Sequence, residues 1–269
     1  MGCQIFLEYE RILILFIIKI LCFKYINITI MKLIILLILL ILIVILILHL
    51  SYSNFNEKFY NEIEMSPNLS KQDILDLKKG QKIMSNMLKE FNRICRKYNL
   101  KYWCRGGTLI GAMRHKGWIP WDGDIDVGML KEDYEKFKKV TNELPNDIEF
   151  SEPADKPCSK LRSKKAKYIY TKWGNNWDLN KGIQLDIMIF KKKENNKIYG
   201  NMTICGPPDK RERDYSDVFP LKEIKFEDIL VYVPNKYKQL SKEIWGGFPP
   251  PLPNIDKRYP HEGRIEFKT

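Results

Sequence analysis

The chain has 269 residues, which is enough for one catalytic domain with an accessory segment but short for several full domains. Its 45 Lys and Arg residues against 33 Asp and Glu residues give a formal net charge of +12, which favours anionic partners such as nucleotides, phosphoglycans or lipid headgroups. The sequence contains no basic helix with interleaved aromatic residues, so we expect no nucleic-acid partner.

An apolar run near the N-terminus predicts a membrane-spanning helix. Residues 33–50 carry no charged side chain, and His49 is their only ionisable group. A run of this length is about the minimum that crosses a hydrocarbon core of roughly 30 Å. We therefore predict a transmembrane signal anchor at residues 33–50, preceded by a cytoplasmic or juxtamembrane segment at residues 1–32. A second apolar stretch, residues 12–23, is shorter and contains Lys19, so it is interfacial, a second span or an extension, and one span is favoured.

The charges around this run predict its orientation. Residues 51–56 are uncharged, whereas basic residues precede the run at Arg11, Lys19, Lys24 and Lys32. The positive-inside rule then gives a single-pass type II protein whose catalytic domain is lumenal or extracytoplasmic. Glycosylation patterns at Asn68 and Asn201 are compatible with that side. A cleaved signal peptide is the alternative, but the run is longer than a typical signal-peptide core and no clear small-residue cleavage site follows it.

A polar segment without periodicity, residues 51–69, is expected to be a stem between the membrane and a domain at residues 70–269. Ser70 and Asp73 resemble a capping box. Apolar residues then recur every three to four positions, which predicts an amphipathic helix that ends near Asn99.

Strands and helices alternate through the rest of the chain. We predict strands at residues 102–104, 125–129 and 183–190, helices at residues 109–114 and 131–144, and weaker strands around residues 168–173 and 229–233. This order predicts an α+β domain built on a mixed α/β sheet. The Pro-rich segment at residues 249–253 is expected to mark where the compact domain stops.

Four cysteines follow the apolar run, at Cys95, Cys104, Cys158 and Cys205. None belongs to a Cys-x-x-Cys motif, which argues against a structural zinc site. We expect either one or two disulfides or buried thiols.

Three carboxylates stand at alternate positions in Trp-Asp-Gly-Asp-Ile-Asp, namely Asp122, Asp124 and Asp126. In an extended segment they lie on one face, where their mutual repulsion is costly unless a cation neutralises it. Carboxylate oxygens suit Mg²⁺ or Mn²⁺. An isolated Asp-x-Asp is about as often an Asp-rich surface turn, so the neighbouring motifs decide.

Two further motifs favour a phosphate-handling site. Gly106, Gly107 and Thr108 stand between a predicted strand and a helix, where bare backbone N–H groups and a hydroxyl can bind an anion. Asp186 lies between apolar residues on a predicted buried strand, where a carboxylate without a partner would be costly. Each motif alone is also explained as a simple turn or as an ion pair with a nearby base, but their combination is much less frequent by chance.

The stretch of residues 105–128, Arg-Gly-Gly-Thr-Leu-Ile-Gly-Ala-Met-Arg-His-Lys-Gly-Trp-Ile-Pro-Trp-Asp-Gly-Asp-Ile-Asp-Val-Gly, closely resembles the signature of the LicD family, which includes fukutin and fukutin-related protein. The resemblance implies a nucleotidyltransferase-like fold. It also implies transfer of a phosphorylated small group, phosphocholine or a pentitol phosphate, from a CDP-activated donor to a hydroxyl of a glycan or glycoconjugate acceptor. Two departures are Gly123, where relatives often carry an acidic or aromatic residue, and the lack of a large extra domain found in the animal members.

Each candidate residue then receives an expected role. Mg²⁺ or Mn²⁺ would bind Asp122, Asp124, Asp126 and Asp186, the last three of which are the candidate catalytic residues. Asp186 would either complete the metal shell or act as a general base. The donor phosphate would bind Gly106, Gly107 and Thr108, and Arg114 and His115 would bind phosphate or the leaving CMP unless they form only a solvated helix end.

Two other functions compete with this one. A nucleotide-sugar glycosyltransferase also uses an Asp-x-Asp motif, but it requires a nucleotide-binding region of roughly 100 residues before that motif. Here only about 70 residues separate the apolar run from Asp124. A catalytically inactive membrane interaction protein would have no need of three converging carboxylates, which are costly to keep.

Overall fold

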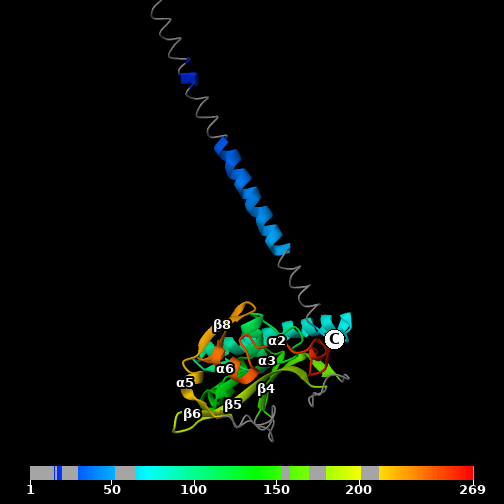
Figure 1. The fold of residues 1–269 in the computed structure, drawn as a ribbon, viewed down its shortest axis with the longest axis vertical. Coiled ribbons are helices and arrows are strands. Elements are labelled where there is room, and N and C mark those ends of the chain that lie inside the picture. The colour runs from blue at the N-terminus through cyan, green and yellow to red at the C-terminus, as the bar shows by residue number, and fades with distance from the viewer. Residues whose placement is uncertain are drawn as a thin grey trace, which may run out of the picture. The chain divides into compact units, whose positions relative to one another are not determined.

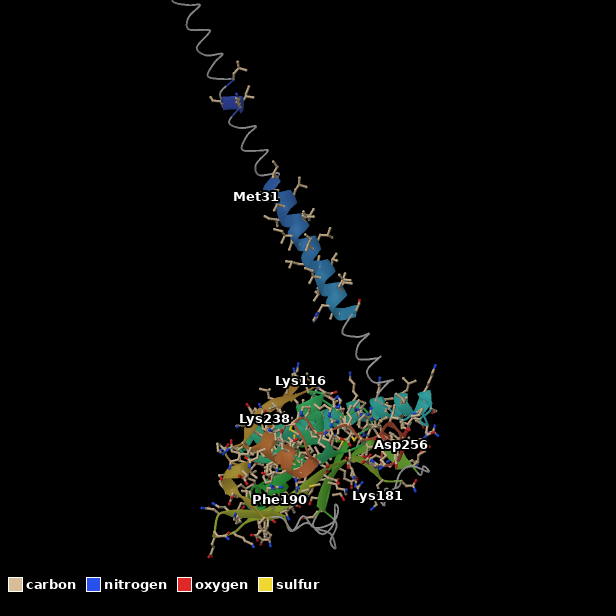
Figure 2. All side chains as sticks on the ribbon, in the orientation of Figure 1. Met31, Lys116, Lys181, Phe190, Lys238 and Asp256 are labelled. Carbon is tan, nitrogen blue, oxygen red and sulfur yellow. The ribbon has the colours of Figure 1, made fainter. Side chains whose placement is uncertain are left out.

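The computed structural model describes residues 15, 17–19, 30–51, 65–152, 158–169, 180–200 and 212–268. The chain divides into two compact units, Met1–Ile63 and Glu64–Thr269, and each is described by itself. In the first unit, the predicted apolar segment forms part of the helix Ile30–Ser51, which is long and apolar enough to cross a membrane. Its apolar side chains, from Met31 onward, are exposed along its whole length (Figure 2).

The second unit begins with helix α2 (Lys71–Lys97), which confirms the predicted amphipathic helix. Its first turn is closed by a capping box, because the Asp73 N–H donates to Ser70 Oγ and the Ser70 N–H donates to the Asp73 carboxylate, both at 3.1 Å. Its apolar stripe packs in the main core. Met65 and Leu69, which precede the helix, are also buried there.

The centre of this unit is a mixed sheet (Figure 1). Its path runs β1 (Tyr102–Cys104), β2 (Ile125–Leu130), β5 (Gly182–Lys192), β4 (Cys158–Ile169), β10 (Arg264–Phe267). Strand β3 (Ile148–Ser151) also pairs with β4, and β6 (Lys197–Gly200) joins β5 to β7 (Arg213–Asp214). The β2–β5 pair is parallel and the other pairs are antiparallel.

Alternation along the strands gives the sheet two different faces. Ile125 and Val127 of β2 and Ile187 of β5 are fully buried in the main core. The opposite positions of the same strands carry Asp126 and Asp186, which are directly paired in the β2–β5 register. The candidate chemistry therefore lies on the sheet face turned away from the main core.

Shorter elements complete the unit. They are α3 (Gly106–Arg114), α4 (Lys131–Lys138), α5 (Tyr215–Val218), α6 (Tyr237–Trp245), the 3₁₀ turns η1 (Thr141–Glu143) and η2 (Ile255–Lys257), and the hairpin β8 (Lys222–Phe226) with β9 (Ile229–Val233). The weak strand predicted at residues 229–233 is thus confirmed. The helix predicted over residues 131–144 is shorter, because Val140 leaves the helical conformation and a 3₁₀ turn follows.

Two expectations need correction. The Pro-rich segment does not end the compact domain, because β10 pairs with residues 166–169 of β4 and Ile265 is buried in the core. The weak strand expected around residues 168–173 is instead the C-terminal part of the twelve-residue β4, and residues 170–173 lie outside the described residues. Of the cysteines, Cys95 and Cys104 are buried free thiols, whereas Cys205 and the side chain of Cys158 lie outside the described part.

Candidate active site

The site is organised around the connection from β1 to α3. Arg105 is the N-cap of α3, and its N–H donates to the Asp126 carbonyl at 3.0 Å. The Asp126 N–H donates to Thr108 Oγ1 at 2.8 Å. These two bonds fix the first turn of α3 against the start of β2, so the Gly106-Gly107-Thr108 turn lies beside the carboxylates, as the combined motifs suggested.

Three charged side chains form a row across neighbouring strands. Asp126 of β2 pairs with Asp186 of β5, and Asp186 pairs with Lys160 of β4. Lys160 Nζ donates to both Asp186 oxygens, at 2.7 and 2.8 Å, and both side chains are nearly buried. Paired positions on adjacent strands project to the same side, so the row follows directly from strand register.

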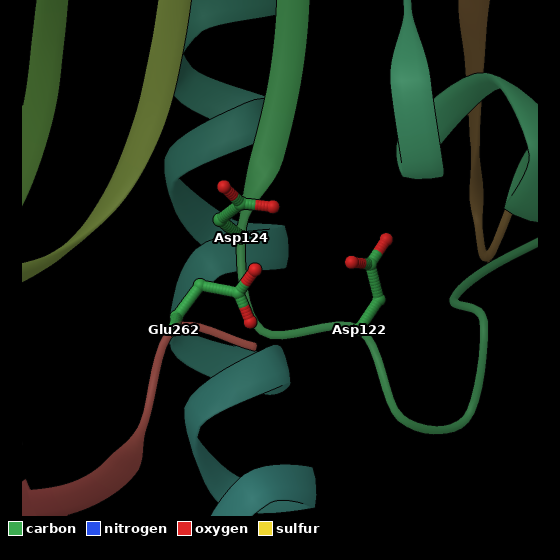
Figure 3. A group of neighbouring side chains, drawn as sticks. All are labelled: Asp122, Asp124 and Glu262. Atoms are coloured by element: carbon green, nitrogen blue, oxygen red, sulfur yellow. The ribbon is translucent and has the colours of Figure 1, made fainter. Parts of the chain in front are cut away.

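The carboxylates fall into two groups that share Asp124. Oxygens of Asp124, Asp126 and Asp186 lie within 4.8 Å of one another, and so do oxygens of Asp122, Asp124 and Glu262. Figure 3 shows the second group, in which Glu262 arrives from the segment that leads into β10 and faces the two aspartates. The structure thus brings together all four predicted aspartates and adds a glutamate that was not predicted.

Burial dominates the electrostatics of this cluster. Burial and then repulsion by Asp186 raise the pKa of Asp126 to about 6, although Arg105 and Lys160 act in the opposite direction. Burial, followed by the charge of Glu262, raises the pKa of both Asp122 and Asp124 well above the usual aspartate range. The folded chain therefore keeps several acids close together in a poorly solvated place, and this arrangement favours a bound cation.

The donor set fits a hard divalent cation. All the groups are carboxylates, which are ligands that Mg²⁺ and Mn²⁺ prefer. Asp122 Oδ2 and Glu262 Oε2 are buried and have no hydrogen-bond partner among the described residues. A buried oxygen without a donor is costly, and a metal–oxygen bond would remove that cost.

Glycines make room for these carboxylates. A Cβ added to Gly107 would lie 2.2 Å from Asp122 Oδ2, and one added to Gly106 would lie 2.3 Å from Asp126 Oδ2. Gly106 also has a φ of +48°, which disfavours other residues. The sequence pointed to these glycines as space for a phosphate, whereas in the structure the close neighbours are aspartate oxygens.

Two residues that sequence reasoning missed hold the Asp-bearing loop in place. Gln81 of α2 donates from Nε2 to the carbonyls of Ile119, Pro120 and Asp122, at 3.2, 3.3 and 2.9 Å. The hydroxyl of Tyr168 on β4 donates to the Gly123 carbonyl at 2.8 Å. Gln81 was detectable only as a polar interruption of an apolar helix stripe, and no local signal marked Tyr168.

A pocket adjoins the glycine turn. It has a volume of about 150 Å³, and Arg105 and Gly106 line it together with aromatic residues that include Trp103, Phe190 and Trp245. The Arg105 guanidinium lies 4.5 Å from the centre of the Phe190 ring. Arg105 therefore contacts the pocket and also acts electrostatically on Asp126.

The structure places Arg114 and His115 at the far end of α3 from the glycine turn. Arg114 donates to the carbonyls of Pro250 and Pro251, the latter at 3.1 Å. Burial and the neighbouring Arg114 lower the pKa of His115 to about 4. Neither side chain belongs to the carboxylate groups, and their expected role in binding phosphate stays a prediction.

The fold and site are those of a mixed α/β domain whose sheet carries clustered carboxylates beside a glycine turn. Residues 99–236, about half of the chain, match the family model described as LicD/FKTN/FKRP, nucleotidyltransferase domain. The chain belongs to the LicD family, which confirms the resemblance carried by residues 105–128.

Individual relatives agree with this assignment. The chain is 48% identical over 66 residues to "Lipopolysaccharide cholinephosphotransferase LicD" of Haemophilus influenzae, covering 24% of this chain and 25% of the relative. It is 26% identical over 160 residues to mouse "Ribitol 5-phosphate transferase FKRP", and the match covers 55% of this chain and 28% of the relative. It is 29% identical over 185 residues to "Uncharacterized protein RP689" of Rickettsia prowazekii, and the match covers 67% of this chain and 56% of the relative. The chain thus spans between about a quarter and just over half of the length of these relatives.

Proposed function

We propose that this chain is a transferase that moves a phosphorylated small group, choline phosphate or a pentitol phosphate, from a CDP-activated donor to a hydroxyl of a glycan or glycoconjugate. The observation that carries the proposal is the convergence of Asp124, Asp126 and Asp186 beside the glycine turn of α3. Relatives named as a cholinephosphotransferase and a ribitol 5-phosphate transferase support the type of group transferred.

In this proposal, different residues bind the metal ion and the donor phosphate. Asp124, Asp126 and Asp186, with Asp122 assisting, would hold Mg²⁺ or Mn²⁺, which supplies neutralisation of charge at the donor pyrophosphate. The first N–H groups of α3, from Gly106 onward, bind the donor phosphate.

Other residues position the reacting groups. Lys160 fixes the orientation of Asp186 through two hydrogen bonds. The aromatic pocket beside Gly106 receives the nucleoside, since its position next to the glycine turn matches a base attached to the bound pyrophosphate.

The direct test uses the full chain in mild detergent, a panel of CDP-linked donors, and Mg²⁺, Mn²⁺ or EDTA. We expect CMP release with one donor class, loss of release in EDTA, and inhibition by free CMP. Asp124→Asn should abolish release without loss of fold, because it removes charge but little volume, whereas Asp256→Asn on the exposed turn η2 should not change it. Absence of CMP release from every donor, or equal release by Asp124→Asn, would refute the proposal. Release of a nucleoside diphosphate from a second panel of nucleotide sugars, without CMP release from the CDP-linked donors, would favour the glycosyltransferase alternative.

We also propose that the helix Ile30–Ser51 anchors the chain as a single-pass type II protein with the catalytic domain lumenal or extracytoplasmic. Asn68 is exposed just before α2, and Asn201 lies outside the described residues. Protease protection in sealed microsomes tests the orientation. Digestion of the domain without detergent would overturn it.

A further inference from the structure

Glu262 lies in the carboxylate cluster although it belongs to a different part of the chain. It follows the region matched by the family model, residues 99–236, and only Gly263 separates it from β10. Pairing of β10 with β4 ties this segment to the sheet, with Arg264 opposite Ile169. The position of Glu262 is therefore set by sheet structure.

The second carboxylate group is geometrically separate from the first, except for one residue. Asp122 and Glu262 belong only to the second group, Asp126 and Asp186 belong only to the first, and Asp124 belongs to both. A carboxylate shared between two ligand sets is how a protein holds two divalent cations a few ångströms apart.

Unsatisfied oxygens give an independent reason to expect a ligand in the second group. Asp122 Oδ2 and Glu262 Oε2 are buried and accept no hydrogen bond from any described residue. In the first group, by contrast, Lys160 donates twice to Asp186. The second group thus contains two buried oxygens without a donor, and a cation bound there would replace the missing hydrogen bonds.

The backbone around Glu262 keeps its carboxylate close to the loop. A Cβ added to Gly123 would lie 2.2 Å from Glu262 Oε2. The absence of a side chain at Gly123 leaves room for the Glu262 carboxylate, which faces Asp122 and Asp124 (Figure 3).

We propose that Asp122, Asp124 and Glu262 form a second divalent-cation site, which takes Mg²⁺ or Mn²⁺ and shares Asp124 with the first. This inference rests on the proposed metal-dependent function and adds to it a ligand from beyond the family match. The two sites together hold two cations on either side of Asp124.

Binding of Mn²⁺ to the full chain in detergent, followed by electron paramagnetic resonance, tests the inference without any activity measurement. Wild type should bind two Mn²⁺ per chain and show the broadened signal of an exchange-coupled pair. Glu262→Gln should lose one Mn²⁺, or weaken it at least tenfold, and show an isolated ion. Glu266→Gln is the matched control, because Glu266 lies on β10 in an exposed ion pair with Lys167.

A second variant protects the test against a folding defect. Gly123→Ala should displace the Glu262 carboxylate and give the same loss of one ion, and melting in EDTA checks that each variant is folded. One Mn²⁺ in both wild type and Glu262→Gln, or two uncoupled and unchanged ions in both, overturns the second site while the proposed function stands. No bound Mn²⁺ in wild type overturns the metal dependence of the proposed function as well.

Discussion

The ion pair between Lys160 and Asp186 allows a quantitative test of the site's structure. Their side chains are only 11% and 7% exposed, and Lys160 Nζ donates to both carboxylate oxygens. Removing one partner of a buried pair costs about 3–5 kcal/mol, because the other charge remains in a poorly solvated place. Lys160→Met should therefore lower the free energy of unfolding by that amount, and a domain of this size should melt roughly 6–20 °C lower.

The control for this change lies on the same strand. Lys167 of β4 forms a 2.8 Å ion pair with Glu266, but the two side chains are 30% and 51% exposed. Lys167→Met should cost less than about 1 kcal/mol, as exposed pairs do. Urea unfolding followed by tryptophan fluorescence, in EDTA, measures both variants.

A double variant separates charge from packing. Lys160→Met with Asp186→Leu removes both charges, so it should recover most of the stability lost in Lys160→Met. Two outcomes would show that the buried Asp186 carboxylate does not depend on the Lys160 ammonium group. One is an equal, small loss of stability in Lys160→Met and Lys167→Met, and the other is no recovery of stability in the double variant.

Two other predictions follow from contacts near the turn and at the end of α3. Gly107→Ala should cost about 1–3 kcal/mol and most of the activity, because its Cβ would meet Asp122 Oδ2, and the stability cost should shrink in an Asp122→Ala background in a double-mutant cycle. An equal cost in both backgrounds would refute the contact. The pKa of His115 is about 4 in the folded chain against 6.5 for the free side chain, so its contribution to stability is complete above pH 6.5 and is lost as the pH falls toward 4. Unfolding curves across this range should fall less steeply for His115→Gln than for wild type, and parallel curves would contradict the buried neutral imidazole.

The features that could be predicted from the sequence are those with local signals. The capping box at Ser70 and Asp73 marks a helix start within four residues, and the alternate aspartates mark one face of a short extended segment. Asp186 was detectable because it is a single acidic residue between apolar residues of a buried strand, where a carboxylate without a partner is costly. Each of these patterns needs only neighbours in the chain.

The features that could not be predicted depend on pairing between distant segments. Strand β4 contains Lys160, Arg162 and other basic residues, so its sequence lacks the apolar alternation of a half-buried strand. Lys160 is buried only because β5 aligns Asp186 beside it. Glu262 follows a Pro-rich segment that resembles a domain end, and only the β10–β4 register reveals its position.

The glycine turn and the carboxylates constrain each other. A donor phosphate bound at Gly106 and Gly107 would lie beside Asp122 and Asp126, because those carboxylates are the closest neighbours of the two glycines. Phosphate and carboxylate repel each other strongly in a poorly solvated site, so an anion can stay there only when a cation lies between them. Binding of the donor and binding of the cation must then strengthen each other by the same factor, since coupling between two ligands is reciprocal. The contacts with Asp122 and Asp126 explain the two glycines without any ligand. The proposed second role of these glycines, binding the donor phosphate, requires the cation as well.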